Sequence, residues 1–78
     1  MHWSSRLPEP ISLKDGRVIA TLAEGRAFIL GLADRRQAAP YWQYSSELLL
    51  RAATRGGKDS AREAWAQLRR ALITEGKP

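Results

Sequence analysis

The 78-residue chain contains no cysteine and only one histidine, and these two shortages exclude most kinds of catalytic or metal chemistry. Without thiols the chain can form neither a disulfide framework nor a thiolate metal site, and a reducing compartment is the typical setting for such a composition. The lone histidine, His2, has no sequence neighbours that would fix its tautomer or position. We therefore predict no catalytic residue, no cofactor and no metal site, and we expect a protein that is not an enzyme.

Long apolar segments are missing as well. The longest uncharged apolar run, at residues 27–33, is far shorter than the roughly 20 residues that a membrane-spanning helix needs. The first residues of the chain contain no apolar stretch of the kind found in secretory signals. The sequence therefore predicts a cytoplasmic protein that does not enter a membrane.

Acidic residues are fewer than basic ones, 8 against 13, which leaves a net charge of +5 and a pI near 10.5. Such a balance favours nucleic-acid partners. Most of the basic residues are arginine, however, and arginine beside abundant alanine is also typical of a GC-rich genome. Charge alone therefore does not choose a class of partner.

A β-hairpin is the clearest structural element in the sequence. Asp15 and Gly16 lie between two short runs with strand character, which predicts a hairpin over residues 11–20 closed by a two-residue type I′ turn. Strand side chains alternate between faces, so the residues paired by this turn would share one face. The predicted pairs are Leu13 with Val18 and Ile11 with Ala20.

Three helices are predicted after the hairpin, at about residues 22–33, 40–55 and 60–74. Thr21 and Glu24 predict a capping box at the start of the first helix. Asp59 or Ser60 is expected to cap the third helix, and Ser60 with Glu63 is a second candidate capping box. A Gly-Gly pair ends the second helix. The short link that follows predicts that the last two helices pack as an antiparallel αα-hairpin.

The limits of the domain follow from the prolines and the apolar pattern. Pro8 and Pro10 exclude regular helix from residues 1–10, which we expect to be an extended or flexible tail. Residues 11–76 then form one small α+β domain. The first helix has two adjacent apolar lines, a stripe wide enough to be covered by the hairpin on one side and by other helices elsewhere. These lines are Leu22, Ile29 and Ala33, and beside them Ala23, Ala27 and Leu30.

A set of short motifs runs through residues 10–76. They are Asp15-Gly16-Arg17, Thr21-Leu22-Ala23, Ala27-Phe28-Ile29-Leu30, Trp42, Glu47-Leu48-Leu49-Leu50-Arg51-Ala52-Ala53 and a closing alanine-rich helix. Together they resemble a set of short uncharacterised bacterial proteins, mainly alphaproteobacterial. The resemblance implies the same hairpin-and-helices fold, and no activity, cofactor or partner comes with it.

Basic residues gather where the second and third helices are predicted to meet. They are Arg51, Arg55, Lys58, Arg62 and Arg69. A helical hairpin would place them around an electropositive end that could contact phosphates. The alternative is a solvated end whose charges complement the helix dipoles.

Aromatic residues and leucines are concentrated in the second helix. Two tyrosines and a tryptophan at 41–44 precede three consecutive leucines at 48–50, which span about 200° of a helix, more than a two-layer core covers. Tyrosine is also a frequent anchor of interfaces. The candidate interface therefore consists of Tyr41, Tyr44, Leu48 and Leu50. The alternative assigns Trp42, Leu49 and one neighbouring leucine to the core, and places another leucine under the N-terminal tail with Trp3.

These observations favour a small non-enzymatic binding protein that occupies a surface of a macromolecule, above all of a protein. Adaptors, antitoxins and phage inhibitors such as anti-CRISPRs are proteins of this kind. The alternative is a basic protein that contacts nucleic-acid phosphates through the end between the second and third helices. A homodimer would also cover the leucines, whereas a small-molecule substrate is not expected because so short a chain can hardly enclose a deep pocket.

Overall fold

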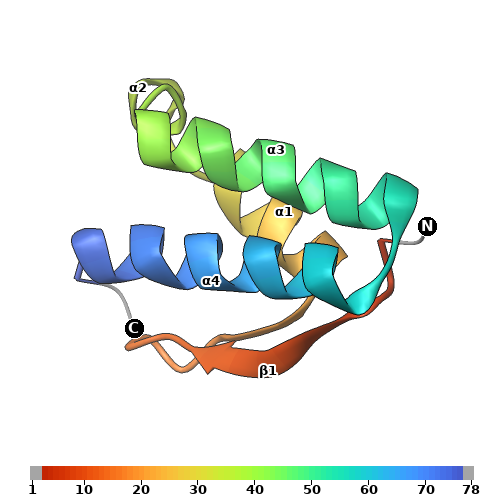
Figure 1. Cartoon of the computed structure of the whole chain (residues 1–78). Helices are drawn as coiled ribbons and strands as arrows, with labels where there is room; N and C mark the ends of the chain where they lie inside the picture. The colour runs from red at the N-terminus through yellow and green to blue at the C-terminus, as the bar shows by residue number, and fades with distance from the viewer. Residues whose placement is uncertain (1–2, 77–78) are drawn as a thin grey trace.

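The computed structural model describes residues 3–76 as a two-stranded antiparallel hairpin followed by four helices (Figure 1). The strands are β1 (Arg6–Ser12) and β2 (Val18–Thr21), and the helices are α1 (Leu22–Leu30), α2 (Asp34–Gln37), α3 (Pro40–Arg55) and α4 (Lys58–Thr74). The predicted α+β class and the helical hairpin are confirmed. The single turn α2 lies in a segment for which no helix was predicted. His2 lies outside the described residues.

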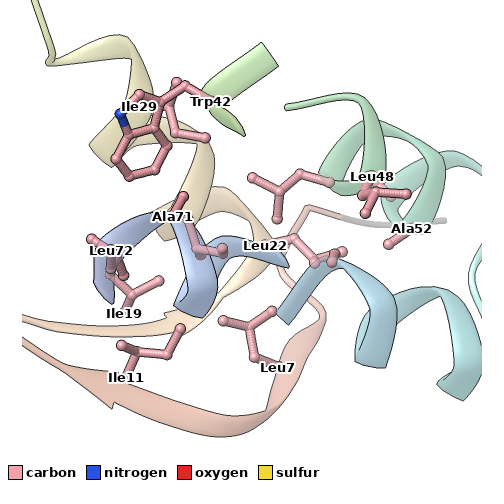
Figure 2. Packing of buried hydrophobic residues seen from close by; sticks show 14 of the residues in the cluster. Leu7, Ile11, Ile19, Leu22, Ile29, Trp42, Leu48, Ala52, Ala71 and Leu72 are labelled. Carbon is pink, nitrogen blue, oxygen red and sulfur yellow. The ribbon is translucent and has the colours of Figure 1, made fainter. Parts of the chain in front are cut away.

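Helix α4 lies between the hairpin and α3, and it packs against both (Figure 1). Helix α1 packs against β2 and α3. Figure 2 shows the resulting core, in which Ile11 and Ile19 of the hairpin lie on the side of Leu72 of α4, and Leu7 lies on the side of Leu22. The hairpin therefore covers one side of α4 and α3 covers another, while residues such as Arg69 and Ile73 stay exposed.

The close approach of α1 to the helical hairpin depends on Gly25. A Cβ atom at this position would lie 3.1 Å from Cδ2 of Leu68 and 3.4 Å from Cδ2 of Leu49. The helical hairpin itself is tight because four of its buried residues are alanines. They are Ala52, Ala53, Ala64 and Ala71. Small residues at these contacts fix the spacing of α1 and α3, which in turn shapes the surface between them.

The turn of the hairpin is one residue longer than predicted. The Gly16 amide donates to the Leu13 carbonyl at 3.0 Å, and the Leu13 amide donates to the Arg17 carbonyl at 2.8 Å. Gly16 has a φ of 94°, whereas Asp15 does not have a positive φ, so the predicted type I′ turn is wrong. This pattern is that of a three-residue loop with glycine at the left-handed position. The Asp15 carboxylate, which accepts from the Arg17 amide at 3.0 Å, favours it.

The extra loop residue shifts the strand register by one, so both predicted pairs are wrong. The observed partners are Ser12 with Val18 and Ile11 with Ile19. A shift of one residue moves side chains to the opposite face. Ile19 is consequently in the core, whereas Val18, predicted to face it, is 51% exposed.

The first strand begins at Arg6, inside the segment that was predicted to be a tail. Arg6 pairs with Thr21, and the pairing is irregular between Arg6 and Ile11. Pro8 and Pro10 lie in this stretch, and proline has no N–H to donate to a ladder. The strand therefore continues past the prolines, but its pairing with β2 is irregular there.

The helix ends agree with the predictions at four of six places, because α1 ends at Leu30 rather than at residue 33 and α4 begins at Lys58 rather than at residue 60. The capping box of α1 is confirmed, because Thr21 Oγ1 accepts from the Glu24 amide at 3.1 Å and Glu24 Oε1 accepts from the Thr21 amide at 3.3 Å. Helix α3 has the predicted bounds, and Gly56, with a φ of 74°, ends it. The predicted capping box at Ser60 and Glu63 is wrong, because α4 begins at Lys58 with Gly57 as its N-cap.

Candidate functional site

The C-terminal end of α4 is fixed by a polar cluster around Glu75. Its carboxylate accepts hydrogen bonds from the Tyr41 hydroxyl at 2.9 Å and from Trp42 Nε1 at 3.0 Å, and it forms an ion pair with Arg36. The Glu75 side chain is only 13% exposed. One carboxylate thus joins the residue after α4 to both α2 and α3. We call Glu75 and its three donors the Glu75 cluster.

These contacts shift the pKa values of both Glu75 and Tyr41. Burial acts to raise the pKa of Glu75, but hydrogen bonds from Arg36, Trp42 and Tyr41 outweigh it, so this pKa lies below its ordinary value of 4.5. The pKa of Tyr41 is raised, first because its hydroxyl donates to Glu75. Both shifts favour a charged carboxylate held by neutral and cationic donors. Tyr41 is therefore engaged inside the molecule rather than presented at an interface.

The four residues of the candidate interface do not form one surface. Leu48 is 3% exposed and belongs to the core, so its assignment to an interface is wrong. Tyr44 and Leu50 are 49% and 54% exposed, but they are six residues apart, which places them about 120° apart around the helix. Tyr44 faces a shallow hollow beside α4. Of the four, only Leu50 lines the concave surface between α1 and α3.

That surface is a groove of about 260 Å³ between α1 and α3, which we call the α1–α3 groove. Ile29 and Leu49 form its base, and both are buried. Leu30 and Leu50 also line the groove, and they are 58% and 54% exposed. A buried apolar base beneath two exposed leucines leaves apolar surface in contact with water.

Trp3 and Arg26 line the part of the groove beside the N-terminal half of α1. The segment before β1 holds Trp3 there, because the Ala23 amide donates to the Trp3 carbonyl at 2.8 Å. The Arg26 guanidinium lies over the indole ring of Trp3, with Cζ 5.2 Å from the ring centroid. The alternative placed a leucine under the N-terminal tail with Trp3. Leu50 lines the same groove as Trp3, but it is 54% exposed and is therefore not covered by the tail.

Polar residues close the rest of the groove. Gln37 of α2 donates through Nε2 to the carbonyls of Leu32 at 2.8 Å and Leu30 at 3.3 Å, which ties α2 to the end of α1. Ser46 of α3 also lines the groove. Of the described residues that line it, Arg26 alone carries a charge.

Of the residues that line the groove, only Leu50 was among the predicted site residues, and Trp3, Arg26 and Leu30 are among those that were missed. A signal for one of them was present, because Leu30 belongs to the second apolar line of the first helix. That line was expected to be covered, but all three of its members are exposed. They are Ala23, Ala27 and Leu30. Of these three residues only Leu30 borders the groove, so the sequence carried a signal for Leu30 but none for Trp3 or Arg26.

The predicted basic residues lie as expected around the turn between α3 and α4. We call Arg51, Arg55, Lys58 and Arg62 the basic tip; all four are exposed. Within residues 3–76, ion pairs form only between Asp15 and Arg17 and at the Glu75 cluster, so no residue of the basic tip is neutralised by one. Arg69 lies farther along α4 with its guanidinium 5.9 Å from the Trp65 ring centroid.

Within residues 3–76, no group of three or more acidic or histidine side chains is placed to hold a metal ion. No helix in this part of the chain combines the length and apolar character needed to cross a bilayer. Comparisons with protein-family models, with curated proteins and with solved structures found no match to the chain. The resemblance to short bacterial proteins stays a prediction.

Proposed function

We propose that this protein is a non-enzymatic binding protein that binds a partner protein through the α1–α3 groove. The observation that carries the proposal is the pair of exposed leucines, Leu30 and Leu50, above a buried apolar base. Single exposed apolar residues are ordinary on protein surfaces, whereas a concave apolar surface with exposed walls is typical of a binding site.

The groove is also held in shape without a partner, which supports the proposal. Gln37 fixes α2 against α1, and Gly25 sets α1 against Leu49 and Leu68. A preformed site loses less conformational entropy on binding than one that must first be ordered. Grooves between two helices commonly receive an apolar side chain from a partner segment.

The experiment compares two double variants that differ only in where the charge is introduced. Leu30→Asp/Leu50→Asp alters the groove, and Val18→Asp/Ile73→Asp alters two apolar residues of similar exposure elsewhere. Each immobilised protein is incubated with an extract of cells that make the natural protein, and bound proteins are quantified by mass spectrometry. We expect a partner to be retained by the wild type and by the control variant, and to be lost from the groove variant.

Folding is checked on the same samples by thermal unfolding followed by circular dichroism. Because all four positions are more than half exposed, each substitution should change the free energy of unfolding by only about 0.5 kcal/mol. Identical sets of bound proteins on the two folded variants would contradict the proposal, as would the absence of any protein retained by the wild type.

The basic tip supports a second candidate function, phosphate contact with nucleic acid. Its four cations are exposed and lack ion-pair partners among the described residues. If they bind duplex DNA, the logarithm of affinity should fall linearly with the logarithm of salt concentration, by about 0.9 per contacted phosphate. Arg55→Ala/Arg62→Ala should reduce this slope, whereas Arg6→Ala/Arg35→Ala, with the same change in net charge, should not. No binding to duplex or single-stranded nucleic acid at low salt would exclude this function.

A further inference from the structure

The size and lining of the α1–α3 groove restrict what can enter it. Its volume is about 260 Å³. An apolar cavity of about 150 Å³ is large enough for a benzene ring. The groove therefore has room for one large aliphatic or aromatic side chain, resting on Ile29 and Leu49, with little space left for another.

Arg26 adds a second requirement, namely that the ligand carry a negative charge near its apolar side chain. Its guanidinium lies over the ring of Trp3, and no carboxylate of residues 3–76 lies within ion-pair distance of it. A guanidinium has five N–H donors, and contact with one aromatic ring leaves some of them able to donate. A carboxylate is the group that matches those donors in geometry and charge.

Glu24, the acidic residue of α1, does not supply a carboxylate to Arg26. Glu24 is turned toward the start of its own helix, where Oε1 accepts from the amides of Ala20 at 2.7 Å and Thr21 at 3.3 Å. No acidic side chain lines the groove among the described residues. The net charge of +5 would also attract an acidic partner from a distance.

We infer that the α1–α3 groove receives an acidic peptide segment of a partner protein, whose one large apolar side chain enters between Leu30 and Leu50 while a neighbouring carboxylate pairs with Arg26. This inference rests on the proposed function and names the chemical class of the partner. A second copy of the chain is the less favourable occupant, because two molecules of charge +5 repel each other.

The first test selects ligands without assuming a sequence. A library of short random peptides displayed on phage is depleted on immobilised Leu30→Asp/Leu50→Asp and then selected on the wild type. The enriched peptides should contain one large apolar residue flanked by aspartate or glutamate, and they should carry a net negative charge. Enrichment of neutral or basic peptides would overturn the inference, and so would the absence of enrichment.

The second test measures the affinity of an enriched, fluorescently labelled peptide for single variants by anisotropy. Arg26→Gln should weaken binding about tenfold, equivalent to about 1.4 kcal/mol, and Arg26→Lys should recover part of the loss because it restores the charge. Arg35→Gln, an exposed arginine outside the groove lining, should leave affinity unchanged apart from a small general effect of net charge.

The outcomes separate the inference from the proposed function. If binding depends on Leu30 and Leu50 but not on Arg26, the acidic partner is excluded and the groove remains a binding site. If a library selected without the depletion step yields the same peptides on Leu30→Asp/Leu50→Asp as on the wild type, both are excluded. If light scattering shows self-association that this double variant abolishes, a second copy occupies the groove and the inference is overturned.

Discussion

The Glu75 cluster and the α1–α3 groove both use side chains of α3, but they differ in what remains for other molecules to contact. In the cluster, Tyr41, Trp42 and Arg36 all reach one carboxylate of the same chain. In the groove, Leu30 and Leu50 are left more than half exposed. The side chains of the Glu75 cluster bind one another, whereas the leucines of the groove stay available for contact with another molecule.

The largest difference in stability is expected between variants of two adjacent leucines of α3. Leu49→Ala should reduce the free energy of unfolding by about 2–5 kcal/mol, because the side chain is 1% exposed and its loss leaves a cavity. Leu50→Ala should change it by no more than about 0.5 kcal/mol. Urea unfolding followed by circular dichroism measures both. Similar losses for the two variants would mean that Leu50 is part of the core.

Removing the central carboxylate should have the next largest effect. Glu75→Ala leaves the fully buried Trp42 without its acceptor, and the expected loss of unfolding free energy is about 1–3 kcal/mol. Glu63→Ala provides the control, because Glu63 is exposed and forms no ion pair within residues 3–76. Equal stability of the two variants in urea unfolding would show that the cluster contributes nothing.

The same carboxylate should give stability a dependence on pH. Because the pKa of folded Glu75 lies below its ordinary value of 4.5, its charged form stabilises the fold above pH 4.5. This contribution is lost as pH falls from 4.5 through the folded-state pKa. The difference in unfolding free energy between wild type and Glu75→Gln should therefore shrink over that range. Taking the difference cancels Asp15, whose pKa is also lowered, chiefly because its carboxylate accepts from the Arg17 amide. A constant difference would contradict the assignment.

The smallest expected effect distinguishes the two tyrosines. Tyr41→Phe removes one donor to Glu75 and should reduce the free energy of unfolding by about 0.5–1.5 kcal/mol. Tyr44→Phe should leave stability unchanged, because Tyr44 is half exposed and its hydroxyl forms no hydrogen bond within the described residues. Thermal unfolding of the two variants side by side checks the difference, and the reverse order of stability would refute it.

Much of the fold could be predicted because its signals are local. Thr21 and Glu24 mark the start of α1, and Pro40 and Gly56 mark the ends of α3, each through backbone chemistry within a few residues. The register of the hairpin could not be predicted in this way. Both a two-residue and a three-residue loop accept Asp15-Gly16, and the choice depends on contacts of Asp15 with Arg17 and on burial of Ile19.

The candidate site was less predictable because it depends on segments far apart in the sequence. Nothing local indicates that Glu75 would meet Tyr41, 34 residues away, or that Trp3 would lie beside Leu50. The wide leucine arc indicated that the core would not cover all three leucines, and both Leu48 and Leu50 were assigned to an interface, whereas only Leu50 is exposed. Helical periodicity alone did not identify which one, because that depends on the angle at which α1 crosses α3.

The position of Trp3 beside the groove allows its fluorescence to report binding there. The indole of Trp3 is partly buried, lies beneath the Arg26 guanidinium and borders the groove. Its fluorescence emission should change when a ligand displaces the water beside it. Trp42 is fully buried and Trp65 lies on another helix, so neither borders the groove. Intrinsic fluorescence of the Trp65→Phe variant, which has a simpler spectrum than the wild type, would therefore report occupancy without any attached dye.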